Sequence, residues 1–314
     1  MSNRYIAVTI GPIFDTVNLA SSPAALWTGS YMFSFLAKTI CELLVKEGGI
    51  PEENIISPYY TLGTNFPTDC DGVGLYHDRI VFCSDTFTLQ EFDKIKTKAV
   101  ETLAETFAID ATFLKEYVMI YAAVFSDVGH PILETSQYLD GMELARPFAN
   151  EQNGSELLSV LVGEKYYGNE NIKGLPIVKG FRNWQLWKDD SHTALKNLSE
   201  IACSVVNSGM KKHSYYAIVR SDGDRMTKVL EMQAGDGEIR DFSRNCIFYC
   251  AEVAKLVRQY GGVAIYSGGD DLLAILPCES AGGGKAFSNS FRNAIRSLRN
   301  FSAHLIRNLP CLLV

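Results

Sequence analysis

The chain has 314 residues, of which 47% are hydrophobic and 21% are charged, and its formal net charge is −7 at pH 7. This length allows two domains or one large domain, and the composition is that of an ordinary soluble globular protein. The acidic balance argues against a free-standing nucleic-acid-binding protein, which usually has a basic excess, but it does not exclude nucleotide binding.

The sequence has no apolar run long enough to span a membrane, and its first ten residues read as a strand rather than a leader. We therefore expect a cytoplasmic protein with no membrane partner. Its eight cysteines contain no CxxC pair, so no disulfide framework is predicted. Cys246 and Cys250 could share a ligand face of a helix, but without a nearby His or Cys partner they favour core packing.

The first third of the chain alternates strand and helix patterns. Residues 5–10 form a strand that Gly11-Pro12 ends, a loop follows, and apolar residues recur at helical spacing over residues 27–46. The next predicted elements are strands over 54–60 and 79–83, a helix over 89–107 and a buried strand over 118–125. The resulting order, βαββαβ, is that of a ferredoxin-like unit.

The same order returns near the C-terminus. Residues 127–212 are less regular and read as a connecting subdomain with short helices near 155–162 and 193–206. Then follow a strand over 215–221, a helix over 241–260, two strands within 263–277, a helix over 285–307 and a possible strand over 310–314. We predict an α+β fold with ferredoxin-like domains at 1–126 and 213–314, joined by this small, partly helical subdomain.

Two short apolar runs within residues 263–277 flank a Gly268-Gly269-Asp270-Asp271 tip. Glycines reach positive φ at no steric cost, so the motif predicts a hairpin, and its apolar arms read as central strands buried on both faces. Two adjacent carboxylates on so short a turn repel each other, and a divalent cation would relieve this repulsion. The alternative is a solvent-facing hairpin with ordinary turn aspartates.

Asp222 follows the strand predicted over residues 215–221. In a ferredoxin-like sheet the first strand lies beside the central hairpin, so Asp222 should share a metal site with Asp270 and Asp271. Three carboxylates with open positions suit Mg²⁺ or Mn²⁺ on a nucleoside triphosphate. Two ions about 3.5–4 Å apart would activate a 3′-hydroxyl and neutralise the departing pyrophosphate.

The loop after Asp222 is a candidate phosphate site. The backbone N–H groups after Gly223 could hold phosphates as an anion nest, with Arg225 and Lys228 as candidate cations, although both can be solvated surface charges. Asp224 is either a ligand or a cap of the following turn. The remaining predicted nucleotide contacts are Ser267, Gly268 and Gly269.

Three segments resemble the polymerase-cyclase palm of the large subunit of type III CRISPR effector complexes. They are residues 216–226 (YAIVRSDGDRM), 239–243 (IRDFS) and 266–277, which include the GGDD tip. Residues 10–13 and 26–36 resemble the same family's first palm.

This resemblance implies a nucleotidyl cyclase that joins ATP into cyclic oligoadenylates when its complex engages target RNA. By position, Asp222, Asp270 and Asp271 would be metal ligands, Gly268 and Gly269 would shape the turn, and two facing palms would each hold one ATP. The implied partners are the other effector subunits, with guide RNA and target RNA bound through the complex.

The sequence departs from the family pattern in three ways. It shows no N-terminal HD nuclease domain, no cysteine-rich zinc element between the palms and no C-terminal helical domain. His77-Asp78 is a lone HD pair and reads as a strand-edge pair rather than a metal site. Two other functions are considered: a cyclic dinucleotide synthase of GGDEF type, which could act alone, and a non-catalytic scaffold subunit with a vestigial palm.

Overall fold

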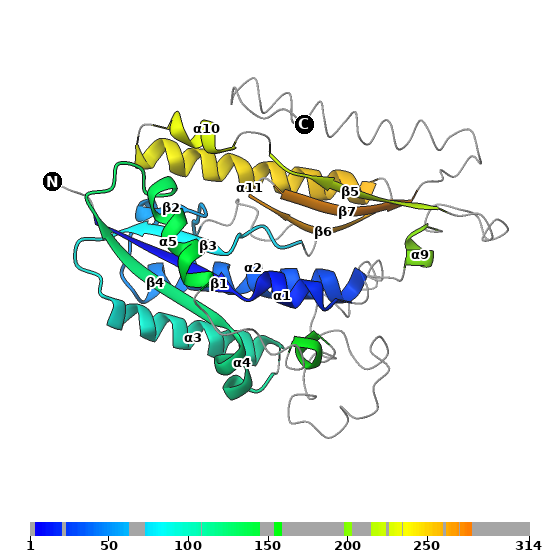
Figure 1. Cartoon of the computed structure of the whole chain (residues 1–314), viewed down its shortest axis with the longest axis horizontal. Helices are drawn as coiled ribbons and strands as arrows, with labels where there is room; N and C mark the ends of the chain where they lie inside the picture. The colour runs from blue at the N-terminus through cyan, green and yellow to red at the C-terminus, as the bar shows by residue number, and fades with distance from the viewer. Residues whose placement is uncertain are drawn as a thin grey trace.

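The structure, a computed structural model, describes residues 4–20, 23–62, 73–107, 109–144, 154–158, 198–202, 215–223, 226–233, 235–259, 262–269 and 271–277. The described strands form two antiparallel sheets, one from each end of the chain. Figure 1 shows the long helices α11, α2 and α3 running roughly parallel, with the second sheet beneath α11 and the first sheet beside α2 and α3. The predicted mixed fold with antiparallel sheets is confirmed.

The first sheet has the ferredoxin-like strand order. Its strands are β1 (Arg4–Gly11), β2 (Ile55–Ser57), β3 (Arg79–Cys83) and β4 (Met119–Ser126). They lie side by side as β2-β3-β1-β4, and every neighbouring pair is antiparallel. The strand predicted over 118–125 is present, but its expected burial is wrong, because β4 is an edge strand whose residues are mostly half-buried or exposed.

Helices cover both faces of this sheet. On one face Ile6, Val8 and Ile10 join a large core with α2 (Pro23–Lys46) and α3 (Leu89–Phe107). On the other face Tyr5 and Ala7 pack with α5 (Leu133–Leu144). Successive side chains of β1 thus point to opposite faces of the sheet, as in any strand, and the side chains on both faces are buried.

The helix bounds follow the apolar pattern closely. The helix α3 has the predicted bounds, and its buried side chains recur every three or four residues. The helix α2 begins four residues before the predicted start. A short helix α1 (Ile13–Asn18) occupies part of the predicted loop, a 3₁₀ turn (Glu52–Asn54) precedes β2, and α4 (Ala111–Tyr117) precedes β4.

The second sheet repeats three strands of the same topology. Its strands are β5 (Tyr216–Ser221), β6 (Val263–Gly268) and β7 (Asp271–Pro277), in the order β5-β7-β6. The short helix α10 (Met226–Glu231) and the long helix α11 (Asp236–Gln259) connect β5 to β6. The helix and strand predicted over 285–307 and 310–314 lie outside the described residues.

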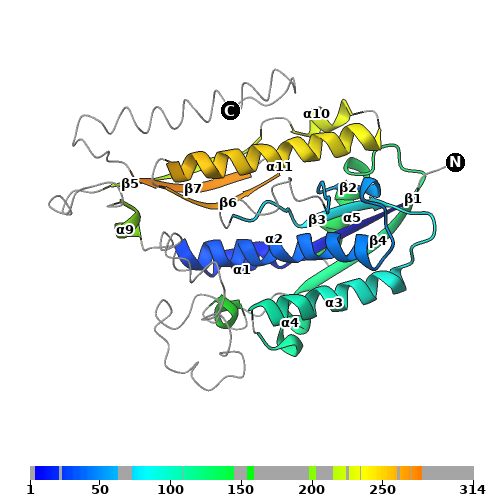
Figure 2. The ribbon, with the colours of Figure 1, turned by 180° about the vertical axis from the view of Figure 1, so that it is seen from behind.

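One expectation about the hairpin is wrong. Among the described strands of this sheet, β7 has a neighbour on each side, whereas β6 lies at the edge. The side chains of β6 are nevertheless mostly buried, because α11 and α2 both pack against this strand. Figure 2 shows the arrangement from behind, with β6 between α11 and α2. The apolar sequence of β6 is therefore explained by its burial between the helices α11 and α2.

The predicted connecting subdomain lies mostly outside the described residues. Its described parts are α5, a helical turn over 154–158 and α9 (Leu198–Ala202), which contacts β5 and β7. Within the described ranges no helix is long and apolar enough to cross a membrane. Cys246 and Cys250 are buried and neither is in a disulfide, as the core-packing prediction requires.

Helix α11 joins the second sheet to the first. The Arg240 guanidinium donates from Nε to the Ile55 carbonyl at 3.2 Å and from Nη2 to the Tyr60 carbonyl at 3.0 Å. It also lies over the Tyr59 ring, 4.1 Å from the centroid. The backbone N–H of Tyr59 donates to Ser243 Oγ at 2.8 Å. We call this set, Arg240 and Ser243 with residues 55–60, the clamp.

Removal of the clamp arginine should destabilise the protein. We expect Arg240→Ala to lower the free energy of unfolding by about 2–3 kcal/mol, because hydrogen bonds to a charged group are worth about 1.5–3 kcal/mol. Arg240→Lys should recover only part of the loss, since an ammonium lacks the planar fork. Urea unfolding measures both changes.

The matched control is Arg244→Ala, one turn further along α11. Arg244 is an exposed residue, and its Nη2 lies 3.9 Å from Asp241 Oδ1, so the substitution should change stability by less than about 0.5 kcal/mol. Equal effects of the two substitutions would contradict the clamp.

Candidate active site

The β6–β7 hairpin tip lies against the first domain. Gly269 has φ +66°, the conformation that the glycine pair predicts, and Gly268 pairs with Asp271. A Cβ built on Gly268 would be 3.8 Å from the Leu75 carbonyl oxygen, so the tip packs close to the chain before β3. The tip therefore belongs to a site to which segments of both sheets contribute.

Strand register brings two of the predicted acids together. β5 and β7 are antiparallel and end at the pair Ser221–Leu272, which places Asp222 opposite Asp271. The pKa of Asp271 is raised, first by burial and then by the negative charge of Asp222, while Arg220 opposes the shift. The third predicted acid, Asp270, lies outside the described residues.

Two further side chains share this electrostatic environment, and the sequence prediction missed both. Arg220 lies on β5, two residues before Asp222, which directly follows this strand, and Tyr266 and Gly268 are two residues apart on β6. The pKa of the Tyr266 phenol is raised by burial and by the charges of Asp271 and Asp222, with Arg220 opposing. The period of two within a strand could have identified both residues, because alternate side chains share a face.

The structure separates Ser267 from the site. Its side chain is buried and donates from Oγ to the Cys250 carbonyl at 3.2 Å, so it points to α11 and lines neither cavity described below. The Cys250 thiol in turn lies 3.4 Å from the Gly269 carbonyl. Ser267 thus has a structural partner in α11, and its predicted contact with a nucleotide has no geometric support.

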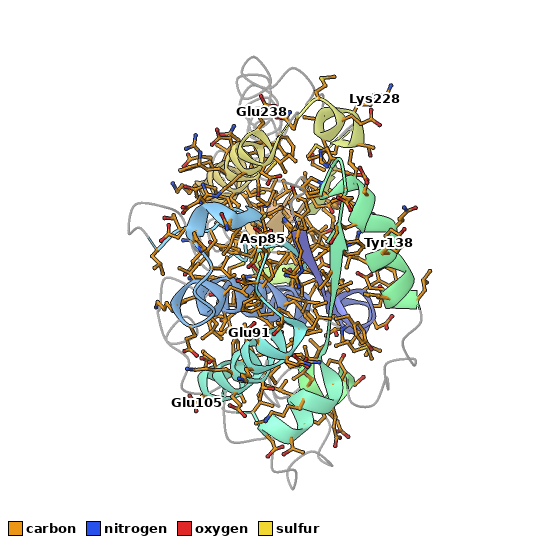
Figure 3. The ribbon with its side chains drawn as sticks, turned by 90° about the vertical axis from the view of Figure 1, so that its left-hand side faces the viewer. Asp85, Glu91, Glu105, Tyr138, Lys228 and Glu238 are labelled. Carbon is orange, nitrogen blue, oxygen red and sulfur yellow. The ribbon has the colours of Figure 1, made fainter. Side chains whose placement is uncertain are left out.

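The predicted phosphate loop is only partly described. Gly223 is half-buried, whereas Asp224 and Arg225 lie outside the described residues. Lys228 is exposed on α10, and its side chain points outward from the molecule (Figure 3). It lines neither cavity, so the structure does not bring Lys228 to the carboxylates.

Two cavities meet at the hairpin tip. The first, of about 520 Å³, lies among α5, α10, α11 and the start of β3. The second, of about 570 Å³, lies among α1, α2 and the β5–β7 sheet. Both are lined by His77, Asp78, Gly268 and Asp271. Each volume is within the range of small-molecule sites, so the tip stands between two ligand-sized spaces.

His77 and Asp78 directly precede β3, where the strand-edge prediction put them, but they also line both cavities. The Arg79 N–H donates to His77 Nδ1 at 3.3 Å, so neutral His77 carries its proton on Nε2 and donates to Ser57 Oγ at 3.0 Å. Burial, helped by the charge of Arg79, lowers the pKa of His77 to about 4. Burial also raises the pKa of Asp78.

The sequence could not show that this pair reaches the tip, because residues 77 and 271 meet only in the folded chain. No group of three or more potential metal ligands is present within the described ranges, which leave out Asp270.

An ion pair holds α5 beside the first cavity. The Arg79 guanidinium pairs with Asp140 and, at 3.4 Å, with Glu143, and it donates to Ser136 Oγ at 2.8 Å. Glu143 also accepts a hydrogen bond from Thr9 of β1. Arg79 is therefore engaged by helix α5.

Two family models match the chain. One, the second palm domain of Cas10/Cmr2, matches residues 215–305 and includes the hairpin. The other, the N-terminal part of the CRISPR-associated protein Cmr2, matches residues 5–110. No curated protein matches the chain.

Solved structures have the same fold. A chain of the Csm1–Csm4 cassette in complex with AMPPNP matches with a TM-score of 0.52 at 13% identity, and the cassette in complex with pppApA matches with 0.53 at 12%. Each match covers 95% of this chain and 48% of the solved chain. A type III-B Cmr-β complex in its apo state matches with a TM-score of 0.55 at 10% identity, covering 95% of this chain and 61% of that one.

The buried imidazole of His77 predicts a pH-dependent stability. The unfolded histidine binds a proton near pH 6.5, whereas the folded one binds it only near pH 4. The native state should therefore lose up to about 3 kcal/mol as the pH falls through this window. His77→Gln should remove this loss, which urea unfolding at several pH values from 7.5 to 4.5 will measure.

The control for this experiment is Ser57→Ala, which removes the hydroxyl partner and keeps the imidazole. It should retain the pH dependence of the wild type. Parallel curves for the wild type and His77→Gln would show that the imidazole is not responsible.

Proposed function

Because the chain belongs to the Cas10/Cmr2 family of type III CRISPR effector large subunits, we propose that it is a nucleotidyl cyclase that makes cyclic oligoadenylate from ATP. One observation carries this proposal: Asp222 and Asp271 lie opposite each other at a hairpin tip that borders two nucleotide-sized cavities. A reaction that joins two nucleotides requires one carboxylate centre with a nucleotide on each side. The complexes of related cassettes with AMPPNP and pppApA support the choice of an adenine nucleotide.

The acids at the tip fit a divalent cation. Asp271 is half-buried, and its pKa is raised first by this burial and then by the negative charge of Asp222. Carboxylate oxygens are the ligands that Mg²⁺ and Mn²⁺ prefer, and a cation would reverse the repulsion between them. Asp222 and Asp271, with Asp270 beside them in sequence, would hold two such ions. When bound, the ions would polarise the 3′-hydroxyl and neutralise negative charge on the leaving pyrophosphate.

The chain's own residues position the reactants. In the proposed reaction the 3′-oxygen of one ATP attacks the α-phosphorus of the other, a new phosphodiester bond forms, and the bond to pyrophosphate breaks. The hydroxyl proton passes to solvent. Arg220 and the Tyr266 hydroxyl lie beside the carboxylates and can contact phosphate oxygens, because both groups donate hydrogen bonds and Tyr266 stays protonated. Gly268 and Gly269 keep the tip narrow enough for close approach.

Residues of both proposed domains would contribute to both nucleotide sites. We assign one ATP to each cavity, with His77 and Asp78 forming the shared wall on the side of the first domain. His77 is neutral at physiological pH, so it adds no charge to this wall. The proposed setting is an RNA-guided type III complex, in which other effector subunits, guide RNA and target RNA control the activity.

Loss of the carboxylates should abolish cyclisation. The full chain, with and without partner subunits and target RNA, would be incubated with radiolabelled ATP and Mg²⁺ or Mn²⁺. We expect Asp222→Asn and Asp271→Asn to reduce product at least about 100-fold. Mutation of a residue that only hydrogen-bonds to a metal ligand typically lowers activity 10–100-fold, and loss of the ligand itself should have a larger effect. Asp270→Asn tests the third acid in the same way.

Asp241→Asn on α11 is the matched control, since Asp241 is exposed and lines neither cavity. It should leave product unchanged. Mass analysis of the product separates cyclic oligoadenylate from a cyclic dinucleotide. Wild-type product levels in Asp271→Asn would refute the cyclase, and a folded wild type without product under every condition would favour a scaffold.

Asp271 should destabilise the folded protein when no divalent metal is bound. Without divalent ions, Asp271→Asn should melt at a higher temperature than the wild type, because the amide removes the repulsion with Asp222. Mg²⁺ should raise the melting temperature of the wild type and have a smaller effect on the variant. Scanning fluorimetry with EDTA and with Mg²⁺ measures both, and an unchanged metal response in Asp271→Asn would contradict the metal site.

A further inference from the structure

Helix α1 places an exposed aromatic side chain on the wall of the second cavity. Phe14 is 71% exposed, although it is large and apolar, and it lines this cavity from the side of the first domain. Its neighbours Ile13 and Val17 on α1 line the same cavity. An aromatic ring left open at the wall of a ligand-sized space is a surface against which a flat ligand can stack.

The walls of this cavity differ in chemistry. Helices α1 and α2 supply mainly apolar side chains, including Leu26 and Phe33, together with small polar ones. The β5–β7 sheet supplies Arg220, Tyr266 and Asp271. Among the described residues that line the cavity, Arg220 is the only cation, and no carboxylate of the described chain lies within ion-pair distance of it.

We propose that the second cavity binds a nucleoside triphosphate in one direction, with its base stacked on Phe14 and its triphosphate beside Arg220. The identity of the ligand as ATP rests on the proposed function. The direction rests on the two walls: the base has an apolar face that suits Phe14, whereas the triphosphate requires a cation. The opposite direction would place the phosphates against apolar α1 and leave no phosphate beside Arg220.

This direction agrees with the position of the carboxylates. Arg220 lies two residues before Asp222, which directly follows β5, and Arg220 and Asp271 both line the cavity. A triphosphate at Arg220 therefore lies next to the carboxylate pair. Phe14 then acts as a positioning residue. Stacking of the base on its ring holds the nucleotide in the cavity with the triphosphate at Arg220.

Equilibrium dialysis with Mg²⁺ tests the proposal without any turnover. Three ligands would be compared on the full chain: ATP, inorganic tripolyphosphate and adenosine. Phe14→Ala should weaken the binding of ATP to one class of site about five- to 150-fold, and it should weaken adenosine binding similarly. Tripolyphosphate binding should stay unchanged. Phe14→Trp should restore ATP binding, and Phe14→Leu should not, since only the former keeps an aromatic face.

The complementary variant is Arg220→Gln, which should weaken both ATP and tripolyphosphate and leave adenosine unchanged. Phe248→Ala is the aromatic control, because Phe248 is 40% exposed on α11 and lines neither cavity. It should bind all three ligands as the wild type does. Because Phe14 is exposed, its variants should fold, and their melting temperatures check this.

Several outcomes would overturn the proposal. If ATP binds and Phe14→Ala leaves every site unchanged, or if Phe14→Ala weakens tripolyphosphate as much as ATP, the direction is wrong while the cyclase can still stand. If ATP binds with the expected dependence on Phe14 but no cyclic product forms, the direction stands and the cyclase fails. If the wild type binds no nucleotide, both fail.

Discussion

The antiparallel register of β5 and β7 is the constraint on which the candidate site depends. It places Asp222 opposite Asp271 at the end of the ladder, where two carboxylates face each other without a counter-charge of equal strength. Such an arrangement opposes folding, so the surrounding structure must stabilise it. The central strand β7 and helix α11 do so by burying the apolar residues of the sheet, including Leu272, Ala274 and Leu276. The site is thus an unfavourable charge pair held by a favourable core.

The second requirement is that the two sheets keep one relative position. Both cavities are lined by residues from both ends of the chain, so neither cavity would exist in one of these parts alone. The clamp at Arg240 and Ser243 uses backbone groups of residues 55–60, and the large core continues from Ile6 in the first sheet to Leu276 in the second. Backbone hydrogen bonds and shared apolar burial act together here, which makes the geometry of the site a property of the whole molecule.

The sequence predicted what depends on local pattern. The bounds of α3, the succession of the described strands along the chain and the turn at Gly269 follow from apolar periodicity and from glycine at a positive φ. It failed where burial depends on distant partners: β4 is a half-exposed edge, and β6 is an edge strand covered by α2 and α11. The same limit applies to side chains. Asp222 and Asp271 could be paired from topology, whereas the turn of Ser267 toward Cys250 and the approach of His77 to the tip arise only in the folded chain.

The repeated fold also explains why the chemistry belongs to the second domain. Asp78 comes directly before β3, as Asp271 begins β7, so the two acids occupy corresponding places in the two sheets. The residue across the ladder from Asp271 is Asp222, whereas the residue across from Asp78 is Ile10, whose N–H donates to the Asp78 carbonyl at 3.0 Å. Across the ladder, the described part of the first sheet therefore has one acid at this place, where the second sheet has a facing pair. A single half-buried carboxylate is a poor cation ligand compared with a pair. The residues before β3 therefore line the cavities, whereas Asp222 and Asp271 supply the negative charge that a cation requires.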